Sequence, residues 1–300
     1  QTLFGEMKGR IKADDSSVPM KDGPFAYGSS YRIGGQHPRY FRTPREGGAE
    51  QLLLDGDAEA EGKAYFNLGG IDHSGDHARI LWGYDDKGSE FYTLKVRDIA
   101  SGADLADLVE NTGGGGTWDA ADRGFFYTAL DDNHRPSRIL YHALGETGDR
   151  LIYEETDPGF FMSVGGSRRN DWIFISINDH ETTEYRLVPA ADPLAAPIVV
   201  APRETGLQYD MEEGGDIFFI LTNADGAKDF KIMEAPVDAP QRANWREVVP
   251  HESGRLILSV MAFSRHLVRL ERKDGLPRII VRDRTTGEEH VIAFEEEAYS

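Results

Sequence analysis

A strongly apolar stretch of four or five residues recurs along the chain at nearly regular intervals. Its copies read ILWGY, FFYTA, WIFIS, IFFIL and LVRL, and they begin 45 to 50 positions apart, at Ile80, Phe125, Trp172, Ile217 and Leu267. A short apolar run bounded by turn residues is typical of a buried β-strand. A repeat of this length is typical of propellers and other repeat architectures.

Each apolar strand is accompanied by three weaker strands in a fixed order. A Gly-rich strand and a polar turn precede it, and an alternating strand and a closing strand follow it. Four short antiparallel strands per unit, with little sign of helix between units, predict an all-β fold, the β-propeller. An earlier copy within 25–54 brings the count to six blades, at approximately 20–56, 64–112, 113–156, 157–204, 205–252 and 253–296, in one propeller domain spanning 1–300.

Four consecutive glycines, Gly113 to Gly116, fall between the predicted strands 105–109 and 114–118. A phosphate-binding loop would need a helix start and, in the P-loop, a Lys-Ser/Thr pair, and neither follows here. We therefore interpret the glycines as backbone of an innermost strand, where a missing side chain lets neighbouring backbones approach closely.

Composition indicates a folded, acidic protein. Hydrophobic residues make up 39% and aromatic residues 10% of the 300 positions, enough for a sizeable core. Asp and Glu number 52 against 33 Lys and Arg, a net charge of −19. This charge disfavours nucleic acid and anionic membranes as partners and favours cationic ones, although a merely soluble surface is the alternative explanation.

The absence of cysteine excludes disulfides, thiolate metal ligands and a cysteine nucleophile. It leaves the redox compartment open, and we expect a cytoplasmic location. No run approaches the roughly 18 apolar residues of a membrane span, and QTLFGEMKGR lacks the apolar centre of a signal peptide. The chain begins without methionine, as an excised piece of a longer protein would.

Catalytic motifs are missing. The nearest approach to a Gly-x-Ser-x-Gly elbow, at 165–169, lacks the second glycine, and there is no His-Glu-x-x-His. His73 and His77, with Asp72 and Asp76, could hold a metal, but Asp, Ser and Gly are also what a hairpin turn requires, and we favour the turn. We expect no metal and no cofactor.

Several segments carry a specific resemblance. They are GRIKADDSSVP at 9–19, DGPFAY at 22–27, YRIGGQHP at 31–38, LIYEE at 151–155, TTEYRL at 182–187 and IAFEEEAY at 292–299. With them the chain closely resembles the oligopeptidase B group of the prolyl oligopeptidase family of serine peptidases. The likeness extends over essentially the whole chain and agrees with the blade count.

The resemblance implies a peptidase of two parts: a seven-bladed propeller, and a C-terminal α/β-hydrolase domain with a Ser-Asp-His triad that cleaves short peptides after Arg or Lys. This chain then corresponds to the propeller alone, which covers the active site and excludes folded proteins. No catalytic residue can be carried over, and the chain by itself is expected to be inactive. Its partners would be the hydrolase domain and short basic peptides.

The resemblance also suggests candidates for the substrate cavity. In related prolyl oligopeptidases the propeller lends apolar residues near the start of a middle blade, and Phe161 is the first choice here, with Phe160 beside it. From the residues themselves, Arg168 and Arg169 could clamp a carboxylate or face a partner domain. Gly114 is a further channel-lining candidate. The alternative for the aromatic pair is core packing between blades.

Six blades against the family's seven imply that one is missing. We expect a gap with edges near 25–31 and 267–294, covered by a partner molecule, or else a relaxed ring that narrows this gap.

Two other functions stay open from sequence: a stand-alone propeller that binds a protein or sugar, and a propeller enzyme of lactonase or glycosidase type. Seven complete blades, or a helical layer, would show that the repeat count is wrong.

Overall fold

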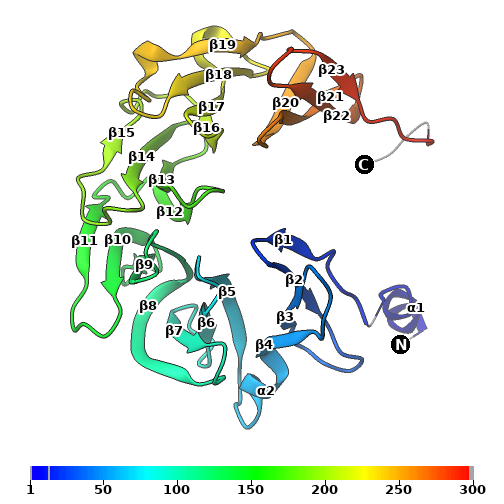
Figure 1. Ribbon diagram of the computed structural model, residues 1–300, viewed down its shortest axis with the longest axis vertical. Helices are drawn as coiled ribbons and strands as arrows, with labels where there is room; N and C mark the ends of the chain where they lie inside the picture. The colour runs from blue at the N-terminus through cyan, green and yellow to red at the C-terminus, as the bar shows by residue number, and fades with distance from the viewer. Residues whose placement is uncertain (1, 13, 297–300) are drawn as a thin grey trace. The chain divides into compact units, whose positions relative to one another are not determined.

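The computed structural model describes residues 2–12 and 14–296, and strands dominate it (Figure 1). The chain divides into two compact units: one comprises 1–116 and 130–134, the other 117–129 and 135–300. The boundary near Gly116 falls inside the long strand β8, Asp104–Trp118.

The first unit begins with an exposed helix and continues with antiparallel strands in chain order. Its elements are α1 (Thr2–Gly9), β1 (Met20–Asp22), β2 (Phe25–Ser30), β3 (Arg39–Pro44), β4 (Gln51–Asp55), α2 (Gly56–Ala60), β5 (Asn67–His73), β6 (Arg79–Asp85), β7 (Tyr92–Asp98) and most of β8. Strands β1 to β4 form one four-stranded sheet. The Asp55 carboxylate caps α2 by accepting the N–H of Ala58 (3.4 Å).

The second unit consists of further meandering sheets with two short 3₁₀ turns. Its elements are β9 (Gly124–Leu130), β10 (Pro136–Ala143), β11 (Arg150–Glu154), β12 (Phe161–Gly166), β13 (Trp172–Asn178), β14 (Thr183–Pro189), β15 (Ile198–Val199), β16 (Tyr209–Glu213), β17 (Ile217–Thr222), η1 (Ala224–Gly226), β18 (Lys231–Pro236), η2 (Arg242–Asn244), β19 (Arg246–Val249), β20 (Arg255–Ala262), β21 (His266–Lys273), β22 (Leu276–Asp283) and β23 (Glu289–Val291). Strands β12–β15, β16–β19 and β20–β23 each form a four-stranded sheet in sequence order.

The predicted repeat is confirmed. The five apolar stretches lie in β6, β9, β13, β17 and β21, each the second strand of its set. Strands β5 to β11 form a seven-stranded sheet in which β8 serves two sets, so the described residues hold six sets of four strands. Helix is limited to α1, α2 and the two 3₁₀ turns within 2–12 and 14–296, and no helical layer separates these sheets.

One detail of the strand prediction was wrong. The expected strands 105–109 and 114–118 are parts of the single strand β8. Asn111 and Gly114 have positive φ angles, 60° and 89°, yet no break in the strand follows. Thr112 bridges this bend, because its hydroxyl donates to the carbonyl of Tyr92 (3.1 Å) and accepts the N–H of Gly114 (3.1 Å). The chain therefore bends here without a loop.

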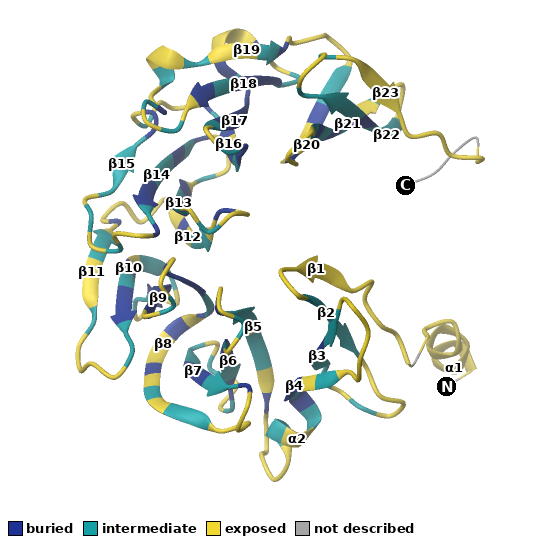
Figure 2. Cartoon of the chain, viewed as in Figure 1, coloured by how far each residue is buried: buried dark blue, intermediate teal, exposed yellow. Residues whose placement is uncertain are grey.

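The core lies along the second strands (Figure 2). Most residues of β9 and β17 are buried, whereas β2 has none fully buried and β22 has one, Ile280. Phe218, on β17, is fully buried and meets the rings of Trp172 and Phe174 edge to face, at 5.6 and 5.9 Å between centroids. The predicted edges, near 25–31 and 267–294, include the half-exposed strands β2 and β22, and the gap between them stays a prediction.

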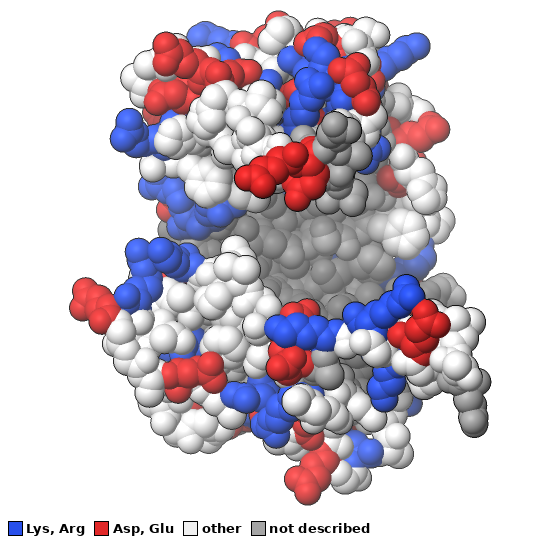
Figure 3. Space-filling model, turned by 90° about the vertical axis from the view of Figure 1, so that its right-hand side faces the viewer, with Lys and Arg blue, Asp and Glu red and all other residues white. Residues whose placement is uncertain are grey.

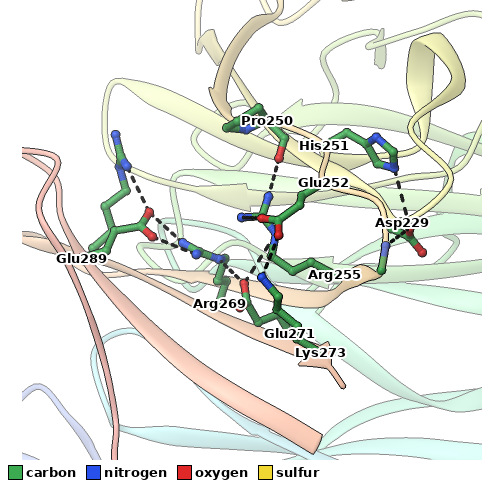
Figure 4. Close-up of polar contacts among 11 residues, drawn as sticks. Asp229, Pro250, His251, Glu252, Arg255, Arg269, Glu271, Lys273 and Glu289 are labelled. Carbon is green, nitrogen blue, oxygen red and sulfur yellow. Dashed lines mark hydrogen bonds and ion pairs between the residues drawn. The ribbon is translucent and has the colours of Figure 1, made fainter. Parts of the chain in front are cut away.

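The sheet β20–β23 is organised differently, because β21 buries charged side chains. Arg269 and Glu271 are each 4% exposed, on the same face of the strand as Leu267. Figure 4 shows Arg269 between two carboxylates: its Nε donates to Glu271 (2.8 Å), and both terminal nitrogens donate to Glu289 on β23 (2.8 Å each). This bidentate geometry satisfies the guanidinium away from water.

Candidate functional site

The two phenylalanines at the start of β12 have different surroundings. Phe161 is 51% exposed, on an edge strand that pairs only with β13. Phe160 is 9% exposed and packs in the core with Met162. The Arg203 guanidinium lies 3.8 Å from the centre of the Phe160 ring. Phe161 therefore has an exposed aromatic surface that a substrate could contact, whereas Phe160 is a core residue.

Arg203 is fixed over Phe160 by carboxylates. Its Nη2 donates to Glu155 (2.6 Å), and its Nε lies 3.6 Å from a carboxylate oxygen of Glu184. Burial acts to raise the pKa of Glu155, but the hydrogen bond from Arg203, with one from the Asp157 N–H, holds that pKa below its ordinary value. This network holds the Arg203 guanidinium over the ring of Phe160, the residue before Phe161.

The predicted arginine pair lies in the turn between β12 and β13. The Arg168 Nε donates to Glu212 (3.3 Å), and its guanidinium lies 5.3 Å from the centre of the Phe263 ring. Glu212 also accepts the N–H of Ala262 (3.0 Å). Arg168 thus joins three neighbouring strands, β12, β16 and β20, at one end.

Arg169 faces a second pair of carboxylates. Its Nε lies 3.1 Å from Asp171 and 3.8 Å from Glu213, and its backbone N–H donates to Glu213 (3.3 Å). Glu213 is 3% exposed. Burial and the neighbouring Asp171 carboxylate raise the pKa of Glu213, against the lowering effect of hydrogen bonds from Ser167 and the Arg169 N–H.

Gly114 lies elsewhere, in the first unit. A side chain there would meet the Tyr92 ring at 2.7 Å, and side chains at Gly69 or Gly83 would meet the Gly114 carbonyl oxygen at 2.3 Å. The glycines thus permit close backbone approach among β5, β6 and β8, as interpreted from sequence. Gly114 itself is buried.

The segment that contains His73 and His77 forms a turn, which is the interpretation that we favoured over a metal site. His73 and His77 flank the turn between β5 and β6, with ring centroids 5.2 Å apart. His73 Nε2 lies 3.2 Å from Asp22, and His77 Nδ1 hydrogen-bonds the Tyr27 hydroxyl (2.7 Å). Burial, with the charges of His73 and Arg42, lowers the pKa of His77 despite the opposing Asp22.

Two searches of the described residues give negative findings. Within 2–12 and 14–296 no three His, Asp or Glu side chains are grouped so that they could hold a metal ion. Over the same ranges no helix is both long and apolar enough to span a membrane. Figure 3 shows acidic and basic side chains intermixed on the face in view.

The comparison with protein families decides the assignment. The family described as "Prolyl oligopeptidase, N-terminal beta-propeller domain" matches residues 1–300. The chain belongs to this family. The six four-stranded sets are accordingly propeller blades, and the lactonase or glycosidase alternative has no support.

Curated relatives of this prolyl oligopeptidase propeller are peptidases. The chain is 33% identical over 319 residues to dipeptidyl aminopeptidase BI of Pseudoxanthomonas mexicana, covering 99% of this chain and 44% of the relative. It is 28% identical over 312 residues to protease 2 of Moraxella lacunata, covering 100% of this chain and 44% of that one. The chain therefore spans less than half the length of these relatives.

Solved structures of oligopeptidase B have a similar fold over nearly the whole of this chain. Oligopeptidase B from Leishmania major superposes with a TM-score of 0.91 at 26% identity, over 99% of this chain and 44% of that one. Oligopeptidase B from Trypanosoma brucei, in a closed form with covalently bound antipain, gives a TM-score of 0.88 at 26% identity, over 99% and 43%.

Sequence reasoning found Arg168 and Arg169 but missed their partners. In sequence, Glu212 and Glu213 fall in the polar segment MEEGGD that precedes the apolar stretch at Ile217. The alternation along β16, with Tyr209, Met211 and Glu213 buried, placed Glu213 on the core-facing side. A carboxylate at a core-facing position of a strand was the signal that could have found it.

Proposed function

We propose that the full-length protein is a serine oligopeptidase that hydrolyses short peptides after Arg or Lys, and that this chain is its lid and size filter. The observation that carries the proposal is the match of all 300 residues to the propeller domain of a peptidase family, with oligopeptidase B among the similar structures. The net charge of −19 supports a preference for cationic peptides, because it favours their approach.

The catalytic groups belong to the hydrolase domain of the full-length protein. The propeller's contribution is steric, with Phe161 as an exposed apolar contact for the peptide. We expect the present chain alone to hydrolyse no Arg or Lys reporter peptide, since no activated nucleophile was found in its sequence. The cytoplasmic location stays a prediction.

A second candidate activity is the removal of dipeptides from the amino end of peptides. The 33% identical relative named dipeptidyl aminopeptidase BI favours it. Such an activity would need a site for the free α-ammonium group of the peptide, whereas an oligopeptidase would accept a blocked amino end.

The experiment compares reporter peptides on the full-length protein. We expect kcat/KM to be about 100-fold or more higher for Arg or Lys before the cleaved bond than for Ala, because a site built for a charge rejects an analogue lacking it. A serine-directed inhibitor should abolish the activity. Equal rates for Arg and Ala peptides would contradict the basic specificity, and a preference for free over acetylated amino ends would favour the dipeptidyl activity.

Phe161 is tested with its neighbour as the matched control. Phe161→Ala should raise KM several-fold with kcat retained, because it removes contact area outside the reacting centre. Phe160→Ala should instead destabilise the fold, by about 3–5 kcal/mol for a buried aromatic side chain. An unchanged KM in Phe161→Ala would remove this residue from the substrate cavity.

A further inference from the structure

Two neighbouring hairpins of the second unit bring together an unbalanced group of charges. The β12–β13 turn supplies Arg168, Arg169 and Asp171, and the end of β16 supplies Glu212 and Glu213. Arg168 pairs with Glu212, and Arg169 is shared by Asp171 and Glu213. We call these five residues the hairpin cluster.

One carboxylate oxygen in the hairpin cluster lacks a hydrogen bond. The Glu213 side chain is 0% exposed, and its Oε1 accepts no hydrogen bond. The nearest cationic atom in its ion pair, the Arg169 Nε, lies 3.8 Å away, beyond hydrogen-bonding distance. An unsatisfied carboxylate oxygen inside a protein costs free energy unless a donor reaches it.

The formal charges of the hairpin cluster also leave a carboxylate without a cationic partner. Three carboxylates face two guanidinium groups, which leaves one negative charge in excess when all are ionised. The nearby Arg284 does not supply the missing charge through a carboxylate contact, because its guanidinium donates to the carbonyls of Gly214 (2.6 Å) and Phe263 (2.8 Å). Burial and the neighbouring Asp171 carboxylate raise the pKa of Glu213, so a proton competes with a cation for this carboxylate.

The chemistry of these side chains suits an organic cation. No metal-binding group of three His, Asp or Glu side chains occurs in the part of the chain that the structure describes. An ammonium group carries three donors on a compact centre, so it can bridge two carboxylates that do not surround a metal. A guanidinium group can do the same with its planar fork.

From this geometry we propose that the hairpin cluster binds one cationic group of a peptide, with Asp171 and Glu213 Oε1 as its acceptors. The route runs past Asp171 and Arg169, whose side chains are 52% and 62% exposed. Arg169 gives way toward solvent as the ligand enters. Arg169 lies against Gly215 at present, where a side chain would come within 3.3 Å of its Nη1.

The biological ligand rests on the proposed peptidase function, but the binding does not. The α-ammonium of a peptide and the side chain of Arg or Lys offer the same chemistry. The experiment therefore separates these two sources and is performed without catalysis, so that its failure would leave the hydrolysis proposal standing.

The test follows the Glu213 carboxyl carbon by NMR in the 300-residue chain. Three probes are titrated: glycyl-glycinamide, with only an α-ammonium; acetyl-arginine amide, with only a guanidinium; and acetyl-glycinamide, which is uncharged. We expect a saturable shift with at least one charged probe and none with the neutral one. If neither charged probe shifts the resonance, the proposal is wrong.

Variants provide the second readout, the dissociation constant of the charged probe that binds. Asp171→Asn and Glu213→Gln should each weaken binding about tenfold, as expected when one charge-assisted hydrogen bond becomes a neutral one. Glu247→Gln, at an exposed position of β19, is the matched control and should leave binding unchanged. Equal binding by wild type and both cluster variants would overturn the assignment.

Discussion

The neighbouring strands β17 and β21 occupy the same position in successive blades, yet their interiors differ. The buried face of β17 is apolar, with Phe218 and Ile220 fully buried. The buried face of β21 carries Arg269 and Glu271, and Glu289 from β23 is the second carboxylate that accepts from Arg269. The difference teaches that a blade position specifies burial and strand geometry, while the chemistry that fills it can be apolar packing or a satisfied ion network.

The largest effect is expected on the apolar side of this comparison. Phe218→Ala should lower the free energy of unfolding by about 3–5 kcal/mol, because it leaves a cavity beside Trp172 and Phe174. Urea denaturation followed by tryptophan fluorescence measures it. A loss below about 1 kcal/mol would mean that β17 is not a packed core strand.

Breaking the ion network around Arg269 should lower the free energy of unfolding by nearly as much. Arg269→Met leaves buried Glu271 with only the more distant guanidinium of Arg255, at 3.9 Å, and should destabilise by about 3 kcal/mol. The triple variant Arg269→Met, Glu271→Leu, Glu289→Leu removes all three charges together and should recover most of that loss. If the triple variant is no more stable than Arg269→Met, the cost does not come from uncompensated charge.

The pH dependence should run in opposite directions for two glutamates. Hydrogen bonding to Arg269, first of all, lowers the pKa of Glu289, so its contribution to stability is present above the ordinary value of 4.5 and is lost as pH falls through the lowered pKa. The pKa of Glu213 is raised, mainly by burial, so the native state holds its proton more tightly and stability falls as pH rises from 4.5 through the raised pKa.

Melting temperatures measured across a range of pH distinguish the effects of the two glutamates. Glu213→Gln should melt above wild type at pH 7, with the difference vanishing below pH 4.5. Glu289→Gln should melt below wild type at pH 7. The groups facing Glu213 are Ser167, Arg169 and Asp171, so Asp171→Asn should reduce the advantage of Glu213→Gln. The same sign for both glutamate variants at pH 7 would contradict this account.

The smallest stability effect should come from the exposed edge strand. Phe161→Ala should change the free energy of unfolding by no more than about 0.5 kcal/mol, because half of the residue already faces solvent. The same urea experiment measures it. A large loss would place Phe161 in the core and remove the reason to assign it to the substrate cavity.

The strand order could be predicted from sequence because it depends on local signals. Apolar runs such as Phe125 to Ala129, each preceded by a polar turn, report burial and chain reversal directly, and the structure confirms them. The continuous strand β8 was missed because Gly113 to Gly116 resemble a break in composition. Its continuity depends on the Thr112 hydroxyl bridging the bend, which is a three-dimensional feature.

The candidate site could be predicted only in part. Phe161 was chosen on family resemblance and the arginines of the β12–β13 turn as a charged pair in the sequence, and the exposure of these residues could not be inferred from sequence. The pairing of Arg169 with Glu213 joins residues 44 positions apart, on different blades. Such contacts depend on how neighbouring blades stack, and the repeat pattern of a single chain does not encode which turn residues meet.

The proposed size filter is tested most directly by one measurement on the full-length protein. A peptide of roughly ten residues with a single Arg is compared with the same segment displayed in a surface loop of a stably folded protein, since exposed loops are otherwise the preferred sites of cleavage. The account predicts cleavage of the peptide and no cleavage of the folded protein over the same time. Cleavage of both at equal rates would contradict the assignment of this chain as a filter.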